Sequence, residues 1–393
     1  MKNFLFVIFI YFVSRAQAQI NNNLSYTFSV GEGYVLPTND FLKGENKDNK
    51  KITNITNLSL KLTKQVDYSE TWHCLYNDFR YGIGLYHGFF NYSDNLGNPF
   101  ALYVFAGFSP YKHKNFTLKN ELALGFSGVW DYYSKDNRQN IAVSLPIEAY
   151  IHWTLEGSWR INNTWQAGVG ISFTHFSNGA LVKPNKGINI ISPTLNVVYT
   201  PKPIERYNVN FTDNFHKNWY FDMGFWAGVH AVNFDYTKED GSRDTVQNSY
   251  PVWGEQIKFM VEVNPKYEFG VGVEYSINDA TWKTDTTHYK THAYEKLDIW
   301  DKTNIGVFFS FHYNVNNFSV LIEPGFALRQ KHGYTPKAYQ RVGLRYYAYK
   351  GWFLQMALKA YNFHVADYIE WGLGYRFGRF KKTENLYGKG WNG

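Results

Sequence analysis

The sequence predicts an all-β protein, a transmembrane antiparallel β-barrel, and three observations lead to this fold class. Apolar and non-apolar residues alternate along short segments through nearly the whole chain, which is the pattern of strands with two unlike faces. Phe, Tyr and Trp make up 20% of the 393 residues, and 32 residues are glycine. The charged fraction of 19% and the mean hydropathy of −0.42 exclude a helical membrane protein. A barrel with an apolar outside, a polar inside and aromatic girdles fits all three observations.

The first residues predict export. Residues 1–3 carry a positive charge, residues 4–13 form an unbroken apolar run, and Ala16-Gln17-Ala18 is a small-x-small cleavage site. This is the layout of a signal peptide, so we expect residues 1–18 to be removed. The apolar run is too short to cross a bilayer as a helix. The single cysteine excludes an intramolecular disulfide framework.

The alternation is clearest at residues 165–173, 267–275 and 369–377, where odd positions are almost all large and apolar. The even positions are rich in glycine, with occasional Glu and Arg. A secreted β-sandwich would also alternate, but its outward face would carry long polar side chains. A barrel lumen tolerates charge, and glycine lets strands curve into closure. The pattern therefore favours a barrel over a sandwich.

Roughly sixteen candidate strands can be counted, and their lengths suit membrane strands. They begin near residues 24, 54, 80, 99, 115, 140, 163, 188, 219, 251, 265, 303, 317, 338, 351 and 367. We expect one barrel of about 12–16 strands over residues 19–377, followed by a basic tail at 378–393. Pro201-Lys202-Pro203 is the best internal boundary, with about eight candidates on either side, so two eight-stranded halves are the alternative. Polar stretches at 37–53, 205–218, 237–248 and 278–302 are predicted loops.

The segment that carries chemistry runs from Phe173 to Asn189. It contains His175-Phe176-Ser177-Asn178 and, further on, Pro184-Asn185-Lys186-Gly187. It resembles the outer-membrane lipid A 3-O-deacylases, also described as acyloxyacyl-hydrolase-like proteins. Their signature is His-x-Ser-Asn, a turn with Pro-Asn-x-Gly, and a third catalytic residue just after that glycine. The match is specific over about fifteen residues and looser over about 80–204, the deacylase-like segment.

The resemblance implies roles for these residues. Ser177 would be the nucleophile, His175 its base, and Asn178 would help to bind the oxyanion. Asn189 takes the third catalytic position. Three further residues would shape the oxyanion site and the turn, namely Gly179, Asn185 and Gly187. No cofactor or metal is implied, and the second half of the chain has no counterpart in the small eight-stranded members.

The parity of the strand places the motif toward lipid. His175 and Ser177 are two residues apart, so both side chains point to one face, the face of Ile171 and the other apolar residues. Asn189 shares the parity of Ile191 and so is expected on the same face. An enzyme that acts on a membrane lipid has a reason to place its nucleophile there. The expected reaction is acyl transfer from an ester to Ser177 and then to water.

The departure from the family pattern lies at Asn189, because that position is commonly Glu. No Asp or Glu occurs between Glu156 and Glu205, so the hairpin itself supplies no carboxylate. An amide can orient a histidine but cannot stabilise the imidazolium by charge. A carboxylate from a neighbouring strand, Glu148 or Glu156, is the alternative.

The expected partner is lipid A or lipopolysaccharide in the outer leaflet of the outer membrane, with no nucleic acid. With both chain ends periplasmic, the seventh strand runs outward and the turn at 178–187 is extracellular. Lys183 and Lys186 of that turn would then contact lipid phosphates or be solvated, and the net charge of +7 allows either. His288 and His292, near Asp285 and Glu295, are read as a polar loop rather than a metal site. The oligomeric state is left open.

Two rival functions remain. A pore or uptake barrel is suggested by the strand number and by charges on the lumen face, with the motif then being structural. An inactive scaffold or adhesin descended from the enzyme is suggested by the amide at Asn189.

Overall fold

The computed structural model describes residues 24–66, 75–202, 217–237, 243–280, 298–330, 336–363 and 365–378. The expected signal peptide at 1–18 lies outside the described residues, as does the basic tail after residue 378. His288 and His292 also lie outside them. Within the described ranges, no helix is long and apolar enough to cross a membrane.

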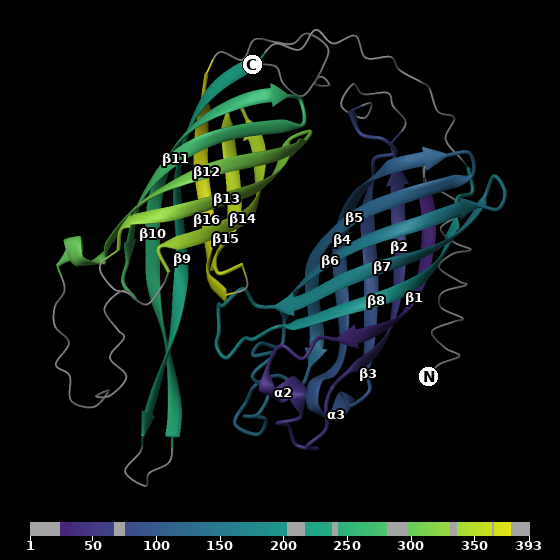
Figure 1. Cartoon of the computed structure of the whole chain (residues 1–393), viewed down its shortest axis with the longest axis horizontal. Helices are drawn as coiled ribbons and strands as arrows, with labels where there is room; N and C mark the ends of the chain where they lie inside the picture. Colours follow the sequence, from purple (N-terminus) through teal and green to yellow (C-terminus); the bar gives the residue numbers. More distant parts are fainter. Residues whose placement is uncertain are drawn as a thin grey trace.

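The first half of the chain forms a closed barrel of eight antiparallel strands (Figure 1). The strands are β1 (Leu24–Val35), β2 (Asn54–Gln65), β3 (Arg80–Phe90), β4 (Gly97–His113), β5 (Phe116–Trp130), β6 (Glu148–Arg160), β7 (Trp165–Ser177) and β8 (Ile188–Tyr199). The barrel closes where β8 returns to β1, with Tyr26 opposite Tyr199 and Val35 opposite Ile190. Two short helices, α2 (Asp40–Lys43) and α3 (Ser93–Leu96), lie in the loops after β1 and β3.

The second half forms another closed barrel of eight antiparallel strands. Its strands are β9 (Asn218–Thr237), β10 (Arg243–Asn264), β11 (Tyr267–Asn278), β12 (Thr303–Val315), β13 (Phe318–Arg329), β14 (Ala338–Tyr349), β15 (Trp352–Tyr361) and β16 (Val365–Phe377). A 3-10 turn, η3 (Ile299–Lys302), precedes β12. Closure is between β16 and β9, with Trp371 opposite Ala227. In Figure 1, β9 and β10 continue as a long hairpin beyond the barrel wall.

The predicted β-barrel fold is confirmed, but the expected single barrel of 12–16 strands is wrong, and the alternative of two eight-stranded halves is correct. Each half pairs its own first and last strands, so neither sheet continues into the other. The barrels are joined by the segment after Tyr199, which begins with Thr200 and Pro201. Alternation looks the same in every strand, whereas closure depends on pairing between strands that are far apart in sequence. The local pattern therefore could not distinguish one large barrel from two small ones.

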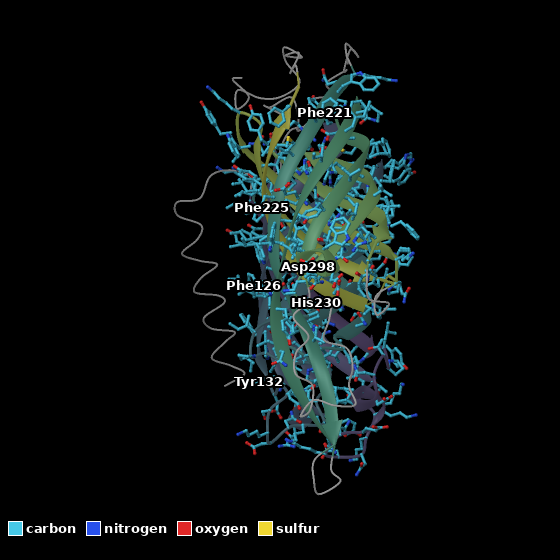
Figure 2. The ribbon with its side chains drawn as sticks, turned by 90° about the vertical axis from the view of Figure 1, so that its left-hand side faces the viewer. Phe126, Tyr132, Phe221, Phe225, His230 and Asp298 are labelled. Carbon is cyan, nitrogen blue, oxygen red and sulfur yellow. The ribbon has the colours of Figure 1, made fainter. Side chains whose placement is uncertain are left out.

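The predicted alternation of faces is confirmed in both barrels. Val169 of β7 and Leu195 of β8 are exposed on the outer wall, while Ser172, at an inward-facing position of β7, is buried. Figure 2 labels Phe126 of β5 and Phe221 and Phe225 of β9, whose rings lie on the outer faces. Such a band of apolar side chains is what a hydrocarbon environment requires.

The interior of the second barrel is filled by paired charges. Arg341 is fully buried, and its guanidinium contacts Glu274, Glu323 and Glu370, with Nε 2.6 Å from the Glu370 carboxylate. Arg376 likewise forms ion pairs with Asp222 and Glu268. An eight-stranded barrel has room for little more than its own side chains, and buried charges persist where they are paired. This interior is a packed ionic core rather than an open lumen.

Candidate active site on the outer wall of the first barrel

The hairpin of β7 and β8 brings the motif residues together. In the register of these strands His175 lies directly opposite Asn189, and Ser177 is the last residue of β7. Directly opposite side chains on one face of an antiparallel pair are close enough to interact. Because His175 and Ser177 are two apart, both side chains stand on that same outer face.

The three side chains form a hydrogen-bonded chain. His175 Nε2 lies 2.9 Å from Ser177 Oγ, and His175 Nδ1 lies 2.7 Å from Asn189 Oδ1. With the amide oxygen accepting, Nδ1 carries the proton and Nε2 is left to accept from the serine hydroxyl. This is the tautomer that a general base for Ser177 requires. All three side chains are half-buried, so the hydroxyl is neither sealed in nor freely solvated.

The turn after Ser177 has an unusual backbone. Gly179 and Ala180 are both left-handed, each with φ of 65°, and both are buried. Alanine rarely adopts this region, because its Cβ meets the following carbonyl oxygen. The surrounding structure must therefore hold the turn in place.

The side chain of Asn178 braces this turn from inside. Its amide Nδ2 donates to Ser144 Oγ at 2.9 Å and to the carbonyl of Val182 at 3.0 Å, and it is 4% exposed. We expected this side-chain amide to bind the oxyanion. However, Asn178 has the parity of the inward-facing residues, and both protons of its Nδ2 already donate to Ser144 and Val182. Asn185, expected in the turn, accepts from the Asn178 backbone N–H at 3.4 Å.

Two other loops support the hairpin. Lys186 and Gly187 donate their backbone N–H groups to the carbonyls of Ile141 and Ala142, each at 3.0 Å. The amide of Asn39, which caps α2, donates to the Gly187 carbonyl at 3.3 Å. Sequence reasoning missed Asn39, Ser144 and this loop contact, since all lie on other strand connections and carry no local signal.

The alternative carboxylates, Glu148 and Glu156, do not reach His175. Both point into the barrel, where Glu148 accepts from the backbone N–H groups of Ser144 and Leu145 and Glu156 pairs with Lys119 at 3.0 Å. Their even parity in β6 explains this, because the outer face belongs to the odd positions. The amide of Asn189 is therefore the group that contacts His175 Nδ1.

The two lysines of the turn have different surroundings. Lys186 is exposed, whereas Lys183 is half-buried beside Asp367 of the second barrel. Burial lowers the pKa of Lys183, and the carboxylate of Asp367 partly opposes this effect. Lys186 is therefore the more accessible of the two for an external phosphate.

Gly187 is expected to be intolerant of a side chain. Its φ is 70°, and a Cβ there would lie 3.0 Å from His175 Cε1. Gly187→Ala should therefore strain the turn by about 1–2 kcal/mol and displace the imidazole, lowering kcat about 10-fold. Steady-state ester hydrolysis and thermal melting would measure both effects. Gly351→Ala, with φ of 88° in the turn between β14 and β15, is the control for a crowded left-handed glycine away from the site. Equal kcat in the two variants would contradict the prediction.

Two protein-family models match the chain. The model described as lipid A 3-O-deacylase (PagL) matches residues 56–199, and the model described as acyloxyacyl hydrolase, C-terminal domain, matches residues 219–379. The first match falls in the first barrel and includes the site, and the second corresponds to the second barrel. None of the curated proteins compared with the chain matches it in sequence.

Solved barrels resemble the chain only remotely. A de novo designed transmembrane β-barrel is 14% identical, covering 46% of this chain and 97% of its own, with a TM-score of 0.22. The NanC porin is 8% identical, covering 90% and 99%, with a TM-score of 0.15. An outer membrane channel from Pseudomonas putida F1 is 8% identical, covering 92% and 97%, with a TM-score of 0.21.

The family matches cover most of the chain, and they fall on both barrels. The motif residues lie within the range of the deacylase model. The chain therefore belongs to the lipid A 3-O-deacylase (PagL) and acyloxyacyl hydrolase family.

Proposed function

We propose that this protein is a serine esterase that removes an ester-linked acyl chain from lipid A, or from a related lipid of the outer leaflet. The observation that carries the proposal is the chain of contacts from Asn189 through His175 to Ser177. It stands on the outer wall of the barrel, where a membrane lipid would lie. A soluble substrate would give no reason to place a nucleophile on that face.

The reaction has two halves. His175 Nε2 takes the Ser177 proton as Oγ attacks the ester carbonyl, and then returns that proton to the leaving sugar oxygen. This leaves an acyl group on Ser177. A water molecule, deprotonated by His175, then attacks the acyl-enzyme, and His175 returns the proton to Ser177 Oγ as the fatty acid leaves. Asn189 holds the imidazole in the required tautomer throughout.

We assign the oxyanion donor to the backbone N–H of Gly179 rather than to the side chain of Asn178. Among the described residues, no acceptor takes up this N–H. It lies two residues after the nucleophile, in the left-handed turn with Ala180. Preorganised backbone donors of this kind stabilise the tetrahedral intermediate, where charge develops on the former carbonyl oxygen.

The location of the site suits an outer-leaflet substrate. If the loops after odd-numbered strands are extracellular, the turn at 178–187 lies at the level of the lipid A ester bonds. Exposed Lys186 is then placed to contact a phosphate of the lipid head group. The packed ionic interior of the second barrel speaks against the pore alternative, because Arg341 and its partners occupy the lumen.

The direct test is mass spectrometry of lipid A incubated with the purified, folded protein. We expect the loss of one ester-linked acyl chain and the appearance of the corresponding free fatty acid. Amide-linked chains should remain, since an amide is a far poorer acyl donor than an ester. The substrate should be the lipid A of the cells that naturally make this protein. If its mass spectrum is unchanged after incubation, the proposal is wrong.

A further inference from the structure

The turn at residues 178–187, which we call the catalytic turn, contacts the outer wall of the second barrel. A Cβ placed on Gly179 would lie 2.6 Å from Ile369 Cδ1 and 3.9 Å from Leu358 Cδ1. Ile369 belongs to β16 and Leu358 to β15, and the two lie opposite each other in the register of these strands. In Figure 1 the connection between β7 and β8 meets the second barrel near the end of β15 and β16. The contact is only two residues from Ser177.

The exposure of the second barrel shows that this patch is covered. Ile369 and Leu358 point outward yet are half-buried. On the same strands and the same face, Leu354, Trp371 and Leu373 are 53%, 60% and 50% exposed. Tyr375, further along the same face of β16, is half-buried as well. Ile369 and Leu358 are the two of these residues that meet Gly179, so the turn of the first barrel contributes to their burial.

Further contacts link the barrels. Half-buried Lys183, in the same turn, lies in the field of the buried Asp367 carboxylate of β16. Elsewhere the Tyr76 hydroxyl donates to the carbonyl of Asn314, and its ring packs edge-on against Tyr313 at 5.9 Å. The contact at Gly179 is therefore part of a docked arrangement rather than an isolated touch.

We propose that the second barrel positions the catalytic turn, with Ile369 and Leu358 as positioning residues for Gly179. This inference rests on the proposed function of Ser177 and Gly179. Consecutive left-handed residues store strain, and packing against a rigid strand pair is what holds them. The two side chains fix the Gly179 N–H relative to Ser177, and they leave no space for a Cβ at residue 179. The second barrel thus contributes to catalysis without touching the substrate.

The test is Ile369→Ala. Losing the support should disorder the oxyanion donor, which acts only in the transition state, so kcat should fall about 10-fold while KM stays within about twofold. Ile369→Leu, which restores the packing, should return most of the rate. Leu373→Ala removes an equally apolar outward side chain from the same strand and should leave kcat unchanged.

Hydrogen exchange of residues 178–187, followed by mass spectrometry, gives a readout that does not need activity. Faster exchange and lower kcat in Ile369→Ala, with neither change in Leu373→Ala, would support the inference. Exchange and kcat both equal to wild type would overturn it. If wild type hydrolyses no lipid A, the proposed function fails by itself. In that case, faster exchange in Ile369→Ala alone still supports the positioning contact, and unchanged exchange overturns it.

Discussion

Replacing Ser177 with alanine is expected to lower the rate of lipid A deacylation by about 10⁴-fold or more. The reason is that the proposed reaction forms a covalent bond to Ser177 Oγ, and alanine offers no nucleophile. His175 and the turn remain in place, so substrate binding should change little. The measurement is the acyl pattern of lipid A from cells that produce wild type or Ser177→Ala, together with kcat of the purified proteins.

Ser172→Ala is the matched control for this prediction. Ser172 lies on the same strand, but its side chain points inward and donates to the Ser192 carbonyl at 3.3 Å. It should lose at most the contribution of one hydrogen bond, about 1 kcal/mol of stability, and no activity. If wild type removes an acyl chain and Ser177→Ala removes it equally well, the serine is not the nucleophile.

Strand positions were predictable because a barrel wall imposes a period of two. The segments expected near 24, 54, 80 and 188 begin at those residues. Two strands differ. The strand expected from about residue 140 begins only at Glu148, and the residues before it form a loop. The Glu148 carboxylate accepts hydrogen bonds from backbone N–H groups of that loop. The strand expected near 251 begins at Arg243, because the hairpin of β9 and β10 extends beyond the alternating segment into polar sequence.

The contacts of the site likewise divide into those that the local sequence pattern predicts and those that it does not. His175, Ser177 and Asn189 could be placed on one face from parity alone, since one hairpin carries all three. The inward-facing side chain of Asn178, by contrast, donates a hydrogen bond to Ser144, which lies in another loop. The contact between Gly179 and Ile369 joins two barrels and depends on how they dock. Local pattern carries no information about such contacts, because they are set by the packing of distant segments.

The second large effect is expected at Asn189. Asn189→Leu keeps the size of the side chain but removes the acceptor that lies 2.7 Å from His175 Nδ1. The neutral imidazole would then lose its preferred tautomer and orientation, and kcat should fall about 10²-fold or more. Steady-state kinetics on lipid A would measure this. Asn196→Leu, on β8 but facing the lumen, should affect stability and leave kcat unchanged.

The opposite change tests whether the amide limits the enzyme. When His175 accepts the serine proton, a neutral amide offers the imidazolium only a dipole, whereas a carboxylate offers a charge-assisted hydrogen bond, which is roughly twice as strong. Asn189→Asp should therefore raise kcat several-fold, with Oδ1 at an unchanged position. An active wild type that gains nothing from the carboxylate would show that orientation alone suffices. A wild type without activity, restored by Asn189→Asp or Asn189→Glu, would instead identify the chain as an inactive relative of the deacylases, whose missing element is the charge on the third residue.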